Sequence, residues 1–366
     1  MTRVMDRYLA EILGQPGAMR RAAAALAAQE ATLQGLVALR RREPIVLTGM
    51  GSSYDACLAA AAALGAAGVL ASTVDTAELL HTRRPALSRA GLVVMVSQSG
   101  RSAEALRLAE ALRQQRDEPR PVLLVVTNGA DTPLARLGDL VLDTGAGHEV
   151  CPSTMTFAAA LVALSAVVEV LGGAGSSEAI ATAGRMADVA AGVSSGLLAE
   201  PDATGLRLER WLDSRSTIFA LGRGVGLAAA EMTALSLMEA AGVPAAAMPT
   251  AEFRHGPLEI AGPDLAVVLF ALEPATQDLD ADFAAELAAA GAGVLLLGPP
   301  ALRPATPSNG PLGSGAVELV GVPDTSAILA PAVAIGPLQL LARQLAHARG
   351  RRPETFAHAS KVTTRE

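Results

Sequence analysis

Two short segments carry more serine hydroxyls than a helix cap needs. The first is Gly51-Ser52-Ser53, and the second runs from Ser97 to Ser102 with Gln98 and Ser99 inside it. Backbone amides at a helix N-terminus bind anions, and short hydroxyl side chains add further donors. One serine in each turn is explained by N-capping, whereas two or three favour a phosphate monoester site. We therefore predict that the phosphate is held by Ser52, Ser53, Ser97, Gln98, Ser99 and Ser102.

Glu239 and His255 are the acid–base candidates. Glu239 lies in a predicted helix, near three apolar residues on one face, namely Met232, Leu235 and Met238. Such apolar surroundings favour the protonated carboxyl and suit it to proton transfer, although an exposed helix glutamate is the simpler alternative. His255 occupies a turn-rich segment, where a plain surface histidine is equally expected. The other histidines have no spacing typical of a metal site, so we expect none.

Lys361 is the only lysine among the 29 basic residues of the chain. Codon bias towards arginine explains most of this pattern, and chance survival of one lysine in a C-terminal tail is the alternative. Lysine can lose its proton and form an imine, whereas arginine can do neither. Lys361 is therefore a candidate for covalent or charge-based chemistry.

Continuous apolar strands alternate with helices in both halves of the chain, which predicts βαβ units and parallel sheets covered on both faces. The strand-to-glycine turns at 45–51 and 218–226 indicate an internal duplication. Residues 5–40 predict two helices broken at Gly14. The strands are expected at 44–49, 91–96, 121–126, 140–142, 216–221, 264–272 and 293–297. The predicted organisation is N-terminal helices (1–30), a first α/β domain (31–172), a linker helix (173–199), a second α/β domain (200–345) and a tail (346–366).

Composition narrows the function classes. The chain has 366 residues, of which 51% are hydrophobic and 18% charged, with a formal net charge of −7. This acidic balance argues against nucleic-acid binding, which needs a basic face. Cys57 and Cys151 are too few for a disulfide framework, and we expect buried free thiols. The N-terminus does not resemble a signal peptide, and the apolar run 157–168 is short for a bilayer. We therefore expect a cytoplasmic protein without membrane contact.

The segment 222–226 (Gly-Arg-Gly-Val-Gly) is similar to a dinucleotide loop. It lacks the third-glycine spacing and an acidic ribose partner, so nicotinamide binding is not expected.

Together these segments resemble the sugar-isomerase (SIS) domain family, in particular its glucosamine-6-phosphate synthases and SIS-type glucosamine-6-phosphate deaminases. The likeness covers nearly the whole chain in order. Glu239 and His255 are spaced sixteen residues apart, like the family's catalytic pair. The other matching segments are the two serine turns (51–54 and 97–102), the loop that closes over the sugar (149–154), the opening of the second domain (222–224), the segment 251–257 and the terminal signature (360–364).

The resemblance implies two tandem SIS domains, each a three-layer αβα sandwich with a parallel, flavodoxin-like sheet. It implies cofactor-free aldose–ketose isomerisation or deamination of a phosphosugar. In that scheme His255 helps to open the ring, Glu239 moves a proton between C1 and C2, and Lys361 contacts sugar oxygens or forms an imine. Gly51 and Ser153 would touch the sugar. Since the family's histidine comes from a neighbouring subunit, a homodimer is expected.

This chain also departs from the family pattern. Ser236 and Met155 replace family lysines, and the loop at Cys151-Pro152 is one residue short. The synthases begin with a glutaminase domain whose nucleophile is cysteine. Residue 2 is Thr here, so we expect that glutamine is not the nitrogen donor through this chain. The identity of the sugar stays open between glucosamine 6-phosphate and others.

Two alternative functions remain at this point. One is a deglycase acting on a phosphorylated sugar–amine adduct, for which the small Ser236 would leave room. The other is a non-catalytic sugar-phosphate sensor, although such regulators usually join one SIS domain to a DNA-binding domain.

Overall fold

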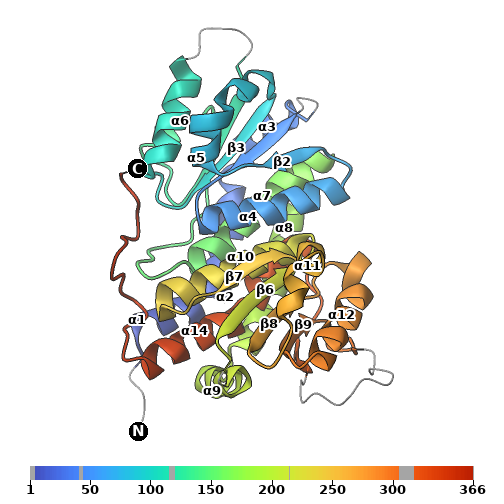
Figure 1. Ribbon diagram of the computed structural model, residues 1–366. Coiled ribbons are helices and arrows are strands. Elements are labelled where there is room, and N and C mark those ends of the chain that lie inside the picture. The colour runs from blue at the N-terminus through green and yellow to red at the C-terminus, as the bar shows by residue number, and fades with distance from the viewer. Residues whose placement is uncertain (1–4, 41–43, 115–119, 214, 305–316, 366) are drawn as a thin grey trace. The chain divides into compact units, whose positions relative to one another are not determined.

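The computed structural model describes residues 5–40, 44–114, 120–213, 215–304 and 317–365. The chain divides into two compact units. The first unit comprises residues 14–191 and 357–366, and the second comprises residues 1–13 and 192–356. The last residues of the chain thus return to the first unit, and helix α8 (Ser176–Leu197) crosses the division. Each unit has its own sheet and its own core (Figure 1).

The first unit contains a five-stranded parallel sheet in the order β2-β1-β3-β4-β5. Its strands are β1 (Ile45–Thr48), β2 (Ala71–Thr73), β3 (Leu92–Ser97), β4 (Val122–Thr127) and β5 (Leu140–Asp143). Its helices are α2 (Gln15–Ala27), α3 (Glu30–Val37), α4 (Ser52–Ala66), α5 (Thr76–Glu78), a π-helical turn (Leu79–Arg83), a 3-10 segment (Arg84–Arg89), α6 (Ala103–Gln114), a 3-10 turn (Ala135–Leu137) and α7 (Met155–Gly172).

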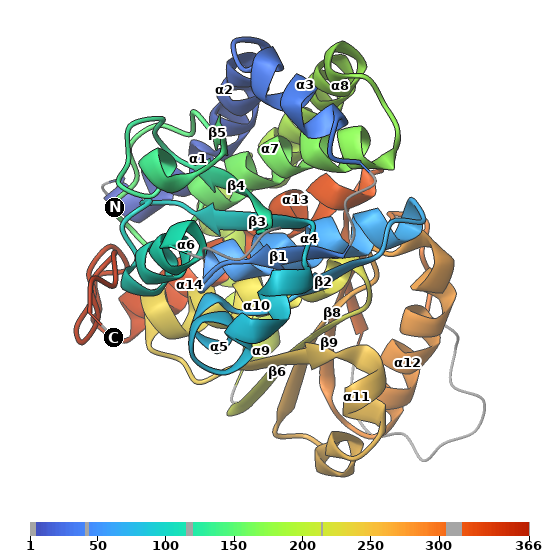
Figure 2. The ribbon, with the colours of Figure 1, turned by 90° about the horizontal axis from the view of Figure 1, so that it is seen from above.

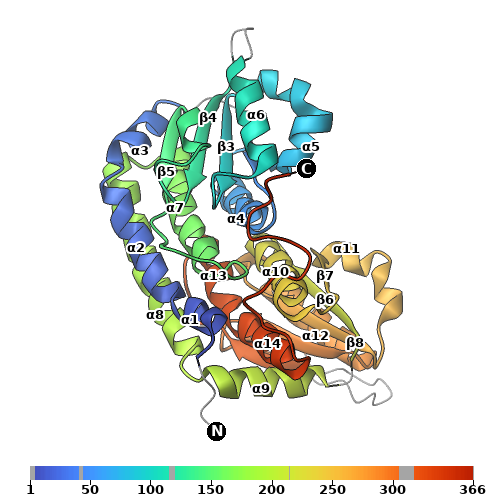
Figure 3. The same cartoon turned by 90° about the vertical axis from the view of Figure 1, so that its left-hand side faces the viewer.

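Side chains of the central strands alternate between two covered faces. Val93, Met95 and Val125 pack with Leu108 of α6 in one cluster. Helices α4 and α7 contact the sheet from the opposite side (Figure 3). Every residue of β3 is buried, as expected for a parallel strand covered on both faces.

The second unit repeats this plan, with the sheet order β10-β9-β8-β6-β7. Its strands are β6 (Thr217–Gly222), β7 (Ala246–Pro249), β8 (Leu265–Phe270), β9 (Gly293–Gly298) and β10 (Val317–Gly321). Its helices are α1 (Arg7–Leu13), α9 (Pro201–Leu212), α10 (Val225–Ser236), a π-helical turn (Leu237–Ala241), α11 (Thr250–Arg254), α12 (Gln277–Ala289), α13 (Ala330–Ala334) and α14 (Gly336–Ala348), with 3-10 turns at Pro257–Ile260, Pro274–Thr276 and Ala327–Leu329. Phe253 of α11 and Phe283 of α12 pack on one face of the sheet, where both helices are seen in Figure 2. Helices α9 and α10 contact the sheet from the other side (Figure 1).

The predicted duplication is confirmed by the matching strand orders and by one repeated turn. Gly51 precedes α4 with φ 53° and ψ −133°, and Gly224 precedes α10 with φ 50° and ψ −125°. Residues that have a Cβ rarely adopt these φ and ψ angles. The two glycines therefore reverse the chain between strand and helix in the same way in both units.

Several sequence predictions of secondary structure need correction. The N-terminal segment forms three helices rather than two, because the chain breaks again at Ala28-Gln29. Strands β2, β7 and β10 were not predicted from the sequence. The apolar run 157–168 belongs to the 18-residue helix α7, which is long and apolar enough to cross a membrane, as is the stretch Ala327–Ala348. Both are buried in the protein, 89% and 100% respectively, as core helices are.

The Gly51 turn yields the first testable prediction. Gly51→Ala should lower the free energy of unfolding by about 1–3 kcal/mol, because the new Cβ forces a disfavoured backbone conformation. Gly184 of α8 is the matched control, since a Cβ there meets nothing within 4 Å. Gly184→Ala should raise the free energy of unfolding by about 0.5–1 kcal/mol. Urea unfolding measures both changes, and equal effects would contradict the role assigned to Gly51.

Candidate active site

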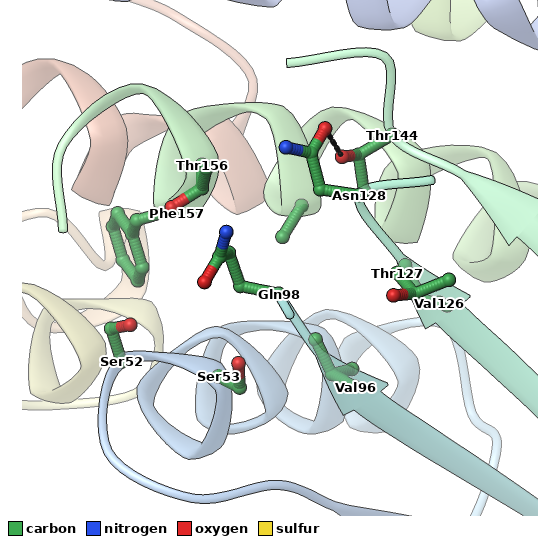
Figure 4. A pocket seen from close by; sticks show the side chains of 11 residues that line it. Ser52, Ser53, Val96, Gln98, Val126, Thr127, Asn128, Thr144, Thr156 and Phe157 are labelled. Atoms are coloured by element: carbon green, nitrogen blue, oxygen red, sulfur yellow. Dashed lines mark hydrogen bonds between the residues drawn. The ribbon is translucent and has the colours of Figure 1, made fainter. Parts of the chain in front are cut away.

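A cavity that is open to solvent lies at the carboxyl ends of β3 and β4 in the first unit. This edge of a parallel sheet is where α/β proteins bind ligands. Ser52 and Ser53 border the cavity from the start of α4, and Gln98 extends between them and Thr156 (Figure 4). The full lining consists of neutral side chains, namely Ser52, Ser53, Val96, Gln98, Val126, Thr127, Asn128, Thr144, Thr156, Phe157 and Ala160.

The structure brings three of the six predicted phosphate residues to this cavity, namely Ser52, Ser53 and Gln98. The other three lie in the same second turn without lining it. Ser97 is buried with its Oγ 3.5 Å from the Oγ of Ser102, and Ser99 Oγ accepts a hydrogen bond from the amide of Arg101 at 3.1 Å. In this structure Ser99 therefore acts in part as the turn cap that was considered as the alternative.

Ser153, predicted to touch the sugar, is joined directly to the first serine turn. Ser52 Oγ donates a hydrogen bond to Ser153 Oγ at 2.8 Å. Ser153 is buried in the loop that follows β5 and precedes α7. Gly51 stands immediately before Ser52, at the sharp turn between β1 and α4.

The lone lysine reaches the same loop from the C-terminal segment. Lys361 Nζ donates to Glu149 Oε2 at 2.8 Å, to the carbonyl oxygen of Cys151 at 2.7 Å and to Ser153 Oγ at 3.4 Å. The hydroxyl group of Ser153 therefore links Lys361 to Ser52. The structure brings together Lys361, Ser153, Ser52 and Ser53 within the first unit.

Glu149 is a site residue that was not singled out from the sequence. Its carboxylate has no exposed surface and accepts hydrogen bonds from the backbone and side chains of Thr154 and Thr156. The family resemblance marked its loop, but nothing in the sequence identified Glu149 as the partner of Lys361.

Asn128 was also missed. Its Oδ1 accepts hydrogen bonds from Thr144 Oγ1 at 3.2 Å and from the amide of Ala146 at 2.9 Å, and its Nδ2 donates to the carbonyl oxygen of Gly147 at 2.8 Å (Figure 4). Asn128 thereby ties the end of β4 to the loop after β5. One feature of the sequence could have identified Asn128 as a site residue. It directly follows the apolar strand β4, just as the second serine turn follows β3.

Glu239 and His255 belong to the second unit. Glu239 is half-buried in the π-helical turn Leu237–Ala241, a rare geometry that recurs at functional sites. Of the apolar neighbours expected for it, Met232 is buried but Met238 is 45% exposed. Ser236 is buried and donates to the carbonyl oxygen of Met232 at 2.8 Å, so its hydroxyl is used within its own helix.

His255 is exposed at the end of the short helix α11. The preceding residue fixes this helix. Arg254 forms a bidentate ion pair with Glu286 of α12, with a shortest N–O distance of 2.6 Å, and its guanidinium lies 4.7 Å from the centre of the Phe283 ring. The histidine thus projects from an anchored helix on the surface of the second unit.

The two cysteines are free and buried, as predicted. Burial raises the pKa of the Cys57 thiol strongly, because a thiolate loses its hydration there. In the part of the chain that the structure describes, no group of three or more His, Cys, Asp and Glu side chains is placed to hold a metal ion.

The chain belongs to the SIS domain family, whose model matches residues 38–170 and 212–298. It is 32% identical over 337 residues to a glutamine–fructose-6-phosphate aminotransferase (isomerizing) of Streptomyces coelicolor, covering 90% of this chain and 53% of that protein. A protein of the same name from Pyrobaculum aerophilum is 28% identical over 365 residues, covering 98% of this chain and 57% of its own length. The chain thus spans about half the length of these relatives.

Solved structures show the same fold. The C-terminal domain of the Francisella tularensis glucosamine-fructose-6-phosphate aminotransferase superposes with a TM-score of 0.83 at 22% identity, covering 96% of this chain and 98% of that one. Tagatose-6-phosphate ketose/aldose isomerase of Escherichia coli gives 0.74 at 21%, covering 97% of each chain. Glucosamine-6-phosphate deaminase of Thermotoga maritima gives 0.67 at 19%, covering 93% and 99%. These structures share the fold of this SIS-domain chain, in which both parallel sheets have the flavodoxin-like strand order.

The neutral lining of the cavity yields the second prediction. Ser53→Ala should weaken the binding of inorganic phosphate roughly 10- to 100-fold, the value of one hydrogen bond to a charged group. Titration calorimetry measures the dissociation constant. Ser88→Ala is the control, because that exposed serine of the same unit donates only to the carbonyl oxygen of Pro85. An unchanged dissociation constant for Ser53→Ala would show that the Ser53 hydroxyl does not donate a hydrogen bond to the phosphate.

Proposed function

We propose that the protein is a cofactor-free phosphosugar isomerase that deaminates an aminosugar phosphate such as glucosamine 6-phosphate. The observation that carries this proposal is the position of Lys361. Its ammonium group contacts Ser153, which is hydrogen-bonded to Ser52 at the serine turn. A cation beside a hydroxyl-rich cavity fits a ligand that has a phosphate at one end and sugar oxygens at the other.

The reaction follows from the chemistry of a 2-amino aldose. His255 helps to open the ring, which exposes the aldehyde at C1. Glu239 takes a proton from C2 and returns it to C1. A second proton passes from the amino nitrogen to the oxygen on C1, so that C1 becomes a CH2OH group and an imine forms at C2. Water adds to this imine and ammonia leaves, so that the products are fructose 6-phosphate and ammonia. Ser52, Ser53, Ser97, Gln98, Ser99 and Ser102 are assigned to the phosphate, Gly51 and Ser153 to the sugar, and Lys361 to the sugar oxygens or to an imine with a ketose carbonyl.

On the basis of the resemblance to the SIS family, we also propose a homodimer in which His255 serves the site of the neighbouring subunit. We also propose a cytoplasmic location, with the sugar phosphate as the ligand and with no nucleic-acid or membrane partner.

A second candidate is removal of the amine from a phosphorylated sugar–amine adduct. It is favoured by the two positions where related enzymes carry lysine. Ser236 is buried and bonded to its own helix, and Met155 is buried at the start of α7. Neither position presents a charge, so a leaving group larger than ammonia meets no cation there.

The direct test is to incubate the protein with glucosamine 6-phosphate and to measure ammonia and fructose 6-phosphate. Glu239→Gln should lower kcat about 100- to 10,000-fold, the usual contribution of a general acid–base group. Lys361→Arg should also abolish most of the turnover, because a guanidinium neither forms an imine nor fits the same contacts. Glu231→Gln is the control, since it removes a carboxylate from the same run of helix, two turns before Glu239.

The outcomes separate the hypotheses. Wild-type rates in Glu239→Gln would contradict the assignment of the proton carrier. If glucosamine 6-phosphate is not turned over, phosphorylated sugar–amine adducts and phosphorylated ketoses are tested next. Binding of sugar phosphates without turnover of any of them would indicate a sensor instead of an enzyme.

A further inference from the structure

The C-terminal segment 357–365 is held to the first unit at few points. Most of its residues are exposed, whereas Lys361 and Val362 are half-buried. Besides the three bonds of Lys361, the amide of Ala103 donates to the carbonyl oxygen of Thr363 at 3.2 Å. The Lys361 side chain is therefore the main polar attachment described for this segment.

The partner of Lys361 is fixed independently of it. Glu149 Oε1 accepts from the amide of Thr154 at 2.9 Å, from Thr154 Oγ1 at 3.0 Å and from the amide of Thr156 at 3.1 Å. Glu149 Oε2 accepts from Thr156 Oγ1 at 2.6 Å and from Lys361 Nζ at 2.8 Å. Four of these five bonds come from the loop that Glu149 begins and from the first turn of α7, so the carboxylate is anchored even when the lysine leaves.

The electrostatics favour occupation of this place by the lysine. The Glu149 carboxylate is fully buried, and a buried charge is costly unless a counter-charge and hydrogen bonds compensate it. The dipole of α7, whose N-terminus begins beside Glu149, compensates part of the charge. The Lys361 ammonium, with 20% of its side chain exposed, supplies the counter-charge.

We propose that Glu149 is a positioning residue. It holds Lys361 beside Ser153 and thereby holds the C-terminal segment on the loop that contains Glu149 and Ser153. Its catalytic consequence depends on the proposed function, but its effect on the segment does not. Without the carboxylate, Lys361 keeps only one carbonyl and one long hydroxyl contact, and the segment should detach.

The single lysine makes this detachment directly measurable. A lysine-specific endoprotease has one cleavage site in the chain, after Lys361, and a cut there removes the last five residues. Glu149→Gln keeps the size of the side chain and removes its charge, and we expect the cut to be at least about tenfold faster, as for a loss of about 1.4 kcal/mol of holding free energy. Glu149→Asp, which keeps the charge on a shorter stem, should give an intermediate rate. Glu110→Gln on α6 is the control and should behave like the wild type.

Hydrogen exchange in residues 357–365 covers the case in which Glu149→Gln fails to fold. Lys361→Met removes the other partner while leaving the loop bonds of Glu149 in place, and exchange in the segment should rise. Wild-type cleavage in a folded Glu149→Gln protein, or wild-type exchange in Lys361→Met, would overturn the proposal.

Turnover then distinguishes positioning from general structure. If Glu149 acts only through Lys361, Glu149→Gln should lower kcat in the wild type but leave it unchanged in the Lys361→Met background. Additive losses would show that Glu149 has a role apart from the lysine. Absence of turnover with every sugar phosphate would refute the proposed function, while the protease and exchange measurements would still decide the role of Glu149 in holding the segment.

Discussion

The constraint on which the site depends is the abrupt turn from β1 into α4. Only a residue without a Cβ readily adopts the conformation of Gly51, and this brings the first turn of α4 directly against the carboxyl end of the sheet. Ser52 and Ser53 then stand at a helix N-terminus, where amides and hydroxyls point the same way. The place of Ser52 and Ser53 in the cavity lining and the Ser52–Ser153 bond both follow from this placement.

The second unit uses the same turn with different chemistry. Val225 and Gly226 stand where the first unit has Ser52 and Ser53, so the turn offers no hydroxyls. The carboxylate of Glu273 lies at this turn, so close to Gly224 that a Cβ added to Gly224 would collide with it. A negative group at a helix N-terminus is stable in this position but does not favour a second anion. The two units therefore share the scaffold of this turn, while the hydroxyls suited to an anion stand at the turn of the first unit.

How far the sequence predicts the structure depends on the range of the interactions. The central strands and the glycine turns were predictable, because continuous apolar runs and glycines leave local signals. Strands β2, β7 and β10 lie at sheet edges with many half-exposed residues, and so lack the apolar run that marks a buried strand. Lys361 was identified from its rarity. Its partner Glu149 lies 212 residues earlier in the chain, and only the tertiary fold brings the two together.

Charge is distributed unusually for a site assigned to a phosphate. Every side chain that lines the cavity is neutral, and the nearby cation, Lys361, is already paired with Glu149. A phosphate here would be bound by dipoles, namely amides and hydroxyls, and not by neutralisation with a basic side chain. Binding of this kind fixes the position of the phosphate through several directed hydrogen bonds. It suits a phosphate that only anchors the ligand and takes no part in the bond changes at distant carbons. The ion pair with Glu149 fixes the direction of the Lys361 side chain, so that the protein itself sets the position of the ammonium group beside Ser153.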